Sequence, residues 1–175
     1  MVIRKVCLVG EPGAGKTSLI QAWVGPDAVP MASPHPDVRV HRKVARAQGS
    51  EVSLVLIDLS RRAAGETYPP EFLRGCAGYV LVVDASRPPS TDSALWLRTR
   101  IEAASGALPF VVAANKQDLV SGGAYDSGAL VPLAGDPEWV VPTSARTGEG
   151  VPTVFDRLAL RILRPAAPLL RARLV

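Results

Sequence analysis

Apolar residues gather in short continuous runs along the chain, and stretches with helical spacing separate these runs. We predict strands at residues 6–9, 38–46, 52–57, 78–83, 110–114 and 139–141. The last three runs contain no charged residue, which is typical of parallel strands covered on both faces. The runs at 38–46 and 52–57 flank Gln48-Gly49-Ser50, a turn sequence, and therefore predict an antiparallel pair.

Helical spacing appears at residues 17–23 and 90–104. The first of these helices directly follows a glycine-rich loop, so the chain opens as a βα unit. In the second helix, Leu95, Trp96 and Ile101 are expected to share a stripe that faces the core.

The last helix is expected to begin near Gly150, with Pro152 in its first turn, where a missing amide costs little. Apolar residues at helical spacing form its expected buried face: Val151, Val154, Phe155, Leu158 and Ile162. Residues 165–175 contain Pro165 and Pro168 and no partner pattern, so we predict an irregular C-terminal tail.

Strands that alternate with helices predict an α/β fold built on a doubly wound sheet. We expect six strands, mostly parallel with one antiparallel edge strand, and helices on both faces. The 175 residues have the size of one ordinary domain, which we place at 1–164. Ligands bind such sheets at the carboxyl ends of the strands, so the loops that follow the strands are the candidate sites.

Composition supports a well-filled core. Hydrophobic residues make up 47% of the chain and charged residues 21%, and the mean hydropathy is +0.18. The two cysteines, Cys7 and Cys76, have neither the number nor the spacing of a zinc site or a disulfide framework. We expect both to be buried, reduced thiols.

The net charge of +4 comes mostly from arginines that are scattered and not interleaved with aromatic residues, so we do not expect nucleic-acid binding. The first residues lack the pattern of an export signal, and no apolar run is long enough to span a membrane. Residues 171–175 offer no cysteine for prenylation, and Val2 stands where N-myristoylation needs glycine. These features predict a cytoplasmic protein without a stable membrane anchor.

Residues 10–17, with the sequence GEPGAGKT, match the G-x-x-x-x-G-K-T loop and lie between a predicted strand and a predicted helix. Glycines let successive amides turn toward phosphate oxygens, and the start of the helix adds partial positive charge. Lys16 is expected to neutralise the β and γ phosphates, and the Thr17 hydroxyl to bind Mg²⁺. The loop predicts a nucleoside triphosphate without specifying its base.

Asn115-Lys116-Gln117-Asp118 follows the strand predicted at 110–114. An ionised carboxylate only accepts hydrogen bonds, so Asp118 suits the N1 and exocyclic amino donors of guanine, a pair that adenine lacks. Together with the phosphate loop, this N-K-x-D sequence resembles the guanine-recognition motif of Ras-type small GTPases of the P-loop superfamily. The resemblance implies a Ras-like fold that binds GTP or GDP with Mg²⁺, with Lys116 over the purine and Asn115 tied to the phosphate loop.

Thr143-Ser144-Ala145-Arg146 resembles the third base-contacting loop of this family, in which the Ala145 amide would donate to guanine O6. The resemblance extends from Val6 to about Leu163. The three loops imply these nucleotide-contacting residues: Gly10, Gly13, Ala14, Gly15, Lys16, Thr17, Ser18, Asn115, Lys116, Asp118, Ser144, Ala145 and Arg146.

The second switch of Ras-like proteins usually reads D-x-x-G-Q, and this chain departs from it. Asp58 keeps the aspartate that suits magnesium, but Arg61 and Arg62 stand at the glycine and glutamine positions. A second alignment matches Ala64-Gly65-Glu66 to A-G-Q and places Glu66 beside the attacking water. Both alignments stay open, and the arginines either supply charge to the transition state or are solvated loop residues. The candidate catalytic residues are Lys16, Arg61, Arg62 and Glu66.

The first switch of the family normally offers a threonine to magnesium, and residues 18–66 contain none. Ser33 is the only hydroxyl residue at 26–37, so it joins Thr17 and Asp58 as a candidate metal ligand. Residues 24–67 also lack the aromatic that family members place against the guanine. Pro12 replaces a glycine that Ras uses near the γ phosphate and would crowd an arginine arriving from a partner.

The resemblance implies a molecular switch that hydrolyses GTP to GDP slowly. The alternative is a pseudo-GTPase scaffold that binds guanine nucleotide without significant hydrolysis. A P-loop kinase needs an adenine site, against which Asp118 argues. The arginine- and alanine-rich composition and the unconventional switches resemble the bacterial group that contains the gliding-motility polarity GTPase. Kinship with that group implies a protein effector or regulator, with the roadblock type as a candidate.

Overall fold

The computed structural model describes residues 1–33, 38–59, 70–87, 91–120 and 127–164. The strands are β1 (Val2–Val9), β2 (Arg39–Ala47), β3 (Ser50–Asp58), β4 (Gly78–Asp84), β5 (Phe110–Asn115) and β6 (Val140–Pro142). The helices are α1 (Lys16–Val24), α2 (Pro70–Leu73), α3 (Thr91–Ser105), α4 (Val131–Ala134) and α5 (Val151–Leu163). Short 3₁₀ turns lie at η1 (Gln117–Leu119), η2 (Ser127–Leu130) and η3 (Pro137–Trp139).

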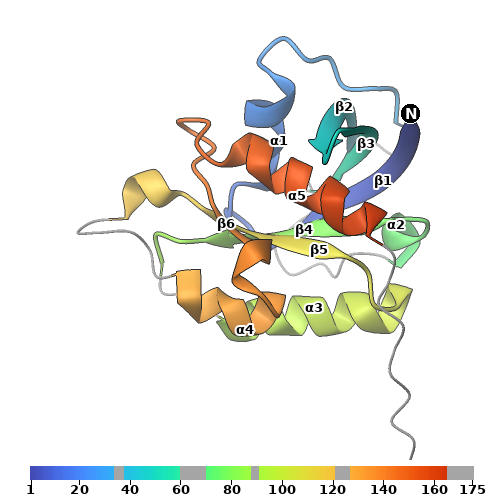
Figure 1. Ribbon diagram of the computed structural model, residues 1–175. Coiled ribbons are helices and arrows are strands. Elements are labelled where there is room, and N and C mark those ends of the chain that lie inside the picture. The colour runs from blue at the N-terminus through green and yellow to red at the C-terminus, as the bar shows by residue number, and fades with distance from the viewer. Residues whose placement is uncertain (34–37, 60–69, 88–90, 121–126, 165–175) are drawn as a thin grey trace, which may run out of the picture.

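The six strands form one sheet in the order β2-β3-β1-β4-β5-β6. Among these six described strands, only β2 and β3 pair antiparallel, and β2 forms one edge of the sheet. Helices cover both faces, with α1 and α5 on one side and α3 and α4 on the other (Figure 1). The predicted fold class is therefore confirmed, including the single antiparallel edge strand.

The register of the strands brings their carboxyl ends to one edge of the sheet. Leu8 pairs with Asp58, and Asp84 pairs with Asn115. Strand β1 lies between β3 and β4. The chain therefore places β2 and β3 on one side of β1 and the later strands on the other side. This reversal of strand order is the place where doubly wound sheets bind ligands, and the phosphate loop follows β1 at that place.

Helix α5 packs its apolar face onto the sheet and α1, as predicted. The Phe155 ring stacks on the Trp23 ring of α1, with centroids 3.9 Å apart and planes 12° apart. Val151, Val154 and Leu158 are also fully buried, and Ile162 packs half-buried against the same core.

The predicted core-facing stripe of α3 was wrong for two of its three residues. Leu95 and Trp96 are 51% and 53% exposed, whereas Ile101 is buried. The buried positions are Ala94, Leu97 and Ile101, which recur at the i, i+3, i+7 spacing of one helix face. Alanine at the first of these positions gave no strong hydrophobic signal, so the larger neighbours misled the prediction.

Strand β6 begins one residue later than expected, because Trp139 ends the 3₁₀ turn η3. Its ring still lies in the core, where the guanidinium carbons of Arg161 and Arg164 lie 4.7 and 4.9 Å from the ring centroid. The predicted tail at 165–175 lies outside the described residues.

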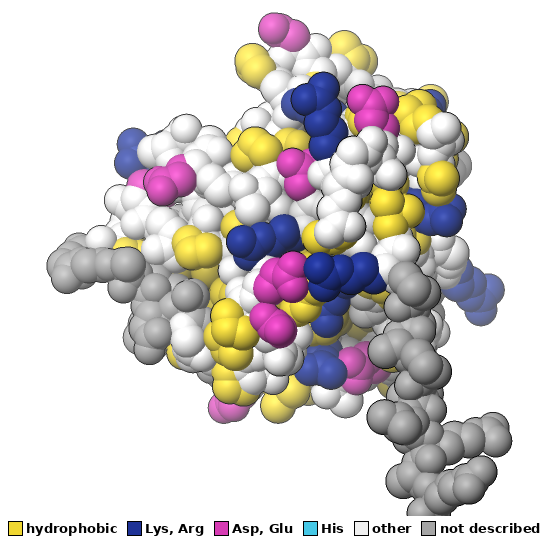
Figure 2. Space-filling view, viewed as in Figure 1, with side chains coloured by type: hydrophobic (Ala, Val, Ile, Leu, Met, Phe, Trp, Pro, Cys, Tyr) yellow, Lys and Arg dark blue, Asp and Glu magenta, His cyan; other side chains and the backbone are white. Residues whose placement is uncertain are grey.

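On the face seen in Figure 2, basic and acidic side chains are interspersed, and no large patch carries a single sign. Among the described residues, no helix combines the length and the apolarity needed to cross a membrane.

The orientation of α3 predicts unequal effects of substitution on its two faces. Ile101→Val is expected to lower the free energy of unfolding by about 0.5–1.5 kcal/mol, because it leaves a cavity in the core. Leu95→Gln, on the exposed face, is expected to change it by less than about 0.5 kcal/mol. Urea titration followed by circular dichroism measures both, and a larger loss for Leu95→Gln would contradict the observed orientation.

Candidate nucleotide-binding site

The phosphate loop joins the end of β1 to the start of α1 and encloses a lysine amino group. The Lys16 Nζ donates to the carbonyl oxygens of Gly10 and Glu11, each at 2.9 Å. Lys16 is only 6% exposed, and this burial lowers its pKa. The loop thus holds an ammonium group in its interior, at the position where the matching motif binds the β and γ phosphates.

Two glycines in this loop are required by space as well as by backbone conformation. Gly10 has φ +149°, and a Cβ added to it would lie 2.2 Å from the Val82 carbonyl oxygen of β4. Gly15 has φ +96°, and a Cβ there would lie 2.3 Å from Asn115 Nδ2. The loop is therefore packed directly against β4 and against the start of the base-reading loop.

Gly15→Ala is expected to weaken GDP binding by at least about tenfold, because the new methyl group displaces the Asn115 amide from the phosphate loop. Isothermal titration calorimetry with GDP measures the change. Gly25→Ala is the matched control, since Gly25 has a similar φ of +107° but open space around its Cβ position. The control should lower stability by about 1–3 kcal/mol and leave GDP affinity unchanged. Equal affinity losses in both variants would contradict the steric explanation.

A hydroxyl and a carboxylate meet beside the phosphate loop. The Thr17 Oγ1 donates to Asp58 Oδ2 at 2.9 Å, and Asp58 is 2% exposed at the end of β3. Two hard oxygen donors of this kind fit Mg²⁺, which keeps several waters and takes further oxygens from substrate phosphates. The described residues contain no cluster of three His, Cys, Asp or Glu side chains, and a magnesium site of this kind does not need one.

Ser33, the third candidate metal ligand, is half-buried in the described part of the loop between α1 and β2. Its contact with Mg²⁺ stays a prediction. The candidate catalytic residues Arg61, Arg62 and Glu66 lie outside the described residues, so the two alignments of the second switch both stay open.

Asn115 connects three loops that are far apart in sequence. Its Nδ2 donates to the Ala14 carbonyl oxygen of the phosphate loop at 3.0 Å. Its Oδ1 accepts from the Ala145 amide at 3.1 Å and from Thr143 Oγ1 at 3.3 Å. The side chain is 1% exposed, and the predicted tie between the base-reading loop and the phosphate loop is present in the structure.

Asp118 points toward the loop that follows β6. Its Oδ1 accepts from Ser144 Oγ at 2.5 Å, and its Oδ2 accepts from Arg146 Nε at 2.7 Å. These bonds, first that from Ser144 and then that from Arg146, hold the pKa of Asp118 below its usual value. The group is therefore an ionised acceptor at neutral pH, as recognition of guanine donors requires. Arg146 is largely exposed, so it can swing away from the carboxylate when a base enters.

Lys116 has a partner that the sequence did not suggest. Its Nζ donates to Asp84 Oδ2 at 2.7 Å, and Arg87 Nε lies 3.7 Å from the same oxygen. Burial raises the pKa of Asp84, but hydrogen bonds from Lys116 and Ser86 outweigh it and leave this pKa below its usual value. Asp84 ends β4, and Asn115, which precedes Lys116, ends β5. The sequence therefore indicated only that polar residues lie at the ends of two strands, and not that Asp84 pairs with Lys116.

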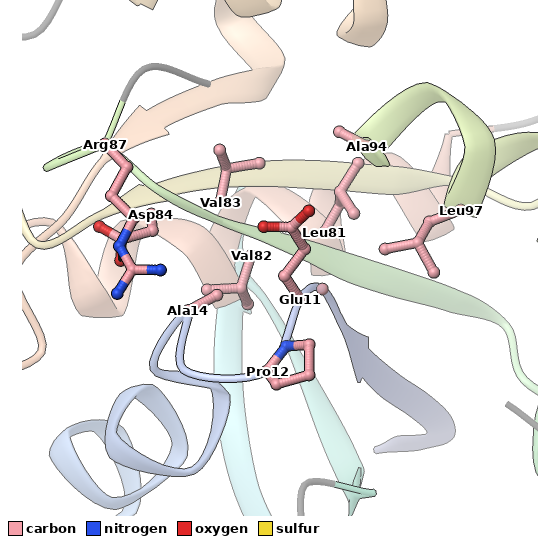
Figure 3. A pocket seen from close by; sticks show the side chains of 11 residues that line it. Glu11, Pro12, Ala14, Leu81, Val82, Val83, Asp84, Arg87, Ala94 and Leu97 are labelled. Carbon is pink, nitrogen blue, oxygen red and sulfur yellow. Dashed lines mark ion pairs between the residues drawn. The ribbon is translucent and has the colours of Figure 1, made fainter. Parts of the chain in front are cut away.

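A cleft opens between the phosphate loop, β4 and α3 (Figure 3). Glu11 and Pro12 line it from the phosphate loop, Asp84 and Arg87 from the end of β4, and Leu97 from α3. Pro12 forms part of one wall of this cleft, and its crowding of an arginine from a partner stays a prediction.

Several proteins that are similar to this chain over most of its length carry GTPase or GTP-binding names. The chain is 28% identical to a "GTP-binding protein Rheb homolog" of Dictyostelium discoideum, covering 89% of this chain and 85% of that protein. It is 26% identical to the human "GTP-binding protein RAD" and 32% identical to "GTPase Obg" of Rhizorhabdus wittichii, each over 91% of this chain. It spans about half the length of these two proteins, 52% and 48%.

A family model described as "Ras of Complex, Roc, domain of DAPkinase" matches residues 5–118. The match begins in β1, includes the phosphate loop and Asp58, and ends at Asp118. Together with the sheet order and the loops at its carboxyl edge, the match shows that the chain belongs to the Roc family of Ras-like small GTPase domains, within the P-loop superfamily.

Proposed function

We propose that this protein is a guanine-nucleotide-dependent molecular switch that hydrolyses GTP to GDP slowly with Mg²⁺. The hydrogen bond from Asn115 Nδ2 to the Ala14 carbonyl is the observation that carries the proposal. It fastens the loop with a base-selecting carboxylate to the loop with a phosphate-binding ammonium group. A ligand with a purine at one end and phosphates at the other would contact both loops at once.

Nucleotide binding would exchange the internal partners of the site for those of the ligand. Lys16 would leave the carbonyls of Gly10 and Glu11 for oxygens of the β and γ phosphates, and charge-assisted bonds to phosphate are the stronger ones. Asp118 would keep Ser144 as a donor and exchange Arg146 for the N1 and amino groups of guanine. Asp84 would hold the Lys116 ammonium so that its alkyl stem lies along the purine.

Hydrolysis transfers the γ-phosphoryl group from the β-phosphate oxygen to water, so the enzyme must position both oxygens and stabilise negative charge. Thr17 and Asp58 would hold Mg²⁺, which supplies part of that positive charge when bound. Among the described residues, Lys16 would supply the remaining positive charge at the phosphates. The sequence has no D-x-x-G-Q glutamine to orient the water, which supports a low intrinsic rate.

The pseudo-GTPase alternative rests on the same departures in sequence. The chain lacks a threonine at 18–66 and has arginines in place of the glycine and glutamine of the second switch. The paired Thr17 and Asp58 support hydrolysis over this alternative, because Mg²⁺ held there would neutralise negative charge that develops as the phosphoryl group is transferred.

A single-turnover experiment tests the proposal. The purified protein is loaded with GTP in EDTA, hydrolysis is started with Mg²⁺, and bound GTP and GDP are separated by chromatography over hours. We expect conversion with a rate constant on the order of 10⁻⁴–10⁻³ s⁻¹, the scale of unassisted Ras-type hydrolysis. The Asp58→Asn variant is the control and should convert more slowly. Bound GTP that stays intact in the wild type would establish the pseudo-GTPase alternative instead.

The regulatory setting of this switch also stays a prediction. Conformational differences between the two nucleotide states are expected at 26–37 and 58–72, where the family places its switches. A protein effector or regulator of the roadblock type, kinship with the gliding-motility polarity group, and a cytoplasmic location are proposed from sequence alone.

A further inference from the structure

The two cysteines of the chain meet in the core, although 69 positions separate them. Cys7 lies in β1 and Cys76 lies just before β4, and their Sγ atoms are 3.0 Å apart. Each sulfur also lies 3.4 Å from the Phe72 carbonyl oxygen of α2. We propose that Cys7 and Cys76 form an oxidative modification site, at which a peroxide converts the thiol pair into an intrachain disulfide.

The geometry needs little change for this reaction. A disulfide has an S–S distance of about 2.05 Å, so the sulfurs must approach by about 1 Å. Cys76 lies outside the strands, after a turn in which its amide donates to the Leu73 carbonyl, so we expect the approach to come from its side of the pair. Cys7 is fixed within the central strand, which pairs with β3 and β4 on its two sides.

The two thiols have different roles because their surroundings differ. Cys76 is 7% exposed and Cys7 is fully buried, so an oxidant reaches Cys76 first. The hydrogen bond between the sulfurs lowers the pKa of Cys76 and raises that of Cys7, which favours the thiolate at Cys76. The nearby Lys5 ammonium also lowers the pKa of Cys76.

The reaction balances in two steps. The Cys76 thiolate attacks one oxygen of hydrogen peroxide, the O–O bond breaks, and a sulfenic acid forms at Cys76 as hydroxide leaves and takes up a proton. The Cys7 sulfur then attacks the Cys76 sulfur, loses its proton, and displaces the hydroxyl as water. The pair loses two electrons and two protons in total, and the peroxide is reduced to two waters.

The disulfide would tie the turn between α2 and β4 to β1, shortly after the segment that the family uses as its second switch. The proposal itself concerns the thiol chemistry and does not depend on GTP hydrolysis. Its test therefore reads the chemical state of the sulfurs and leaves the proposed function to its own experiment.

The test uses the folded 175-residue chain. The chain is treated with hydrogen peroxide, quenched with iodoacetamide in denaturant and analysed by mass spectrometry. We expect a monomer whose mass falls by two hydrogen atoms, no carbamidomethylated cysteine, and a tryptic peptide pair joined through Cys7 and Cys76. Dithiothreitol should restore two alkylated thiols. Two alkylated thiols after peroxide, sulfinic or sulfonic acids alone, or a disulfide between two chains would each overturn the proposal.

Single variants test the assignment of roles. Cys7→Ser should leave Cys76 as a sulfenic acid that dimedone captures, because no second thiol remains to displace the hydroxyl. Cys76→Ser should leave Cys7 unlabelled by dimedone, since Cys7 is fully buried. Circular dichroism confirms the fold of each variant, and the wild-type measurement stands if either fails to fold. Equal labelling of both folded variants would contradict the assignment of Cys76 as the attacking thiol.

Discussion

Replacing Asp118 by alanine is expected to lower GDP affinity by roughly 10²–10⁴-fold. The carboxylate offers two charge-assisted acceptors to guanine, each worth about 1.5–3 kcal/mol, and alanine offers none. ADP affinity should change little, because adenine has no pair of donors for this carboxylate. The preference for guanosine over adenosine nucleotides should therefore collapse. Competition calorimetry with GDP and ADP measures both affinities in the same protein.

Two further variants separate recognition from folding. Asp136→Ala is the matched control, because Asp136 accepts a hydrogen bond from the Glu138 amide at η3 and should leave nucleotide preference unchanged. Asp118→Asn should favour a purine with a carbonyl at position 2, since its amide group can donate to that oxygen. If Asp118→Ala still prefers GDP over ADP as the wild type does, Asp118 does not select the base.

Lys16→Met is expected to lower the rate of GTP hydrolysis by at least about 10²-fold, the scale for loss of one well-placed donor to developing negative charge. Methionine approximates the length of the lysine stem in a site where Lys16 is 6% exposed, so packing is largely kept. Phosphate release under saturating GTP and Mg²⁺ measures the rate. GTP affinity should fall as well, because the ammonium group also contributes to binding of the β phosphate.

Lys43→Met serves as the matched control for this variant. Lys43 lies on the edge strand β2, where its Nζ donates to the Trp23 carbonyl and its side chain is exposed. This substitution removes the same charge and should leave phosphate release unchanged. Equal losses in the two variants would mean that net charge, and not the ammonium inside the phosphate loop, sets the rate.

The motifs and the order of elements were predictable because each depends on residues that are close together in the sequence. A strand that helices cover on both faces needs a continuous apolar run. Helix α5 needs apolar residues at helical spacing. The residues of the phosphate loop lie within eight consecutive positions. Those of the sequence that ends in Asp118 lie within four. The order of these signals along the chain was enough to predict the sheet class.

Contacts between distant segments were not predictable in the same way. Leu95 and Trp96 were expected in the core, and the position of the sheet beneath α3 placed Ala94 and Leu97 there instead. Nothing near Lys116 in sequence indicates Asp84, which reaches it because β4 and β5 are neighbours.

The sequence by itself determined the strand and helix order, the phosphate loop and the base-reading loop, since each depends on residues that are close along the chain. Only the tertiary structure decided that Asn115 also contacts the loop after β6 and that Cys7 lies against Cys76. The physical reason is the sheet order, in which β1 lies between β3 and β4 and the carboxyl ends of the strands share one edge. The spacing of residues along the chain does not indicate which strands are neighbours in the sheet, whereas hydrogen bonding between the strands determines it.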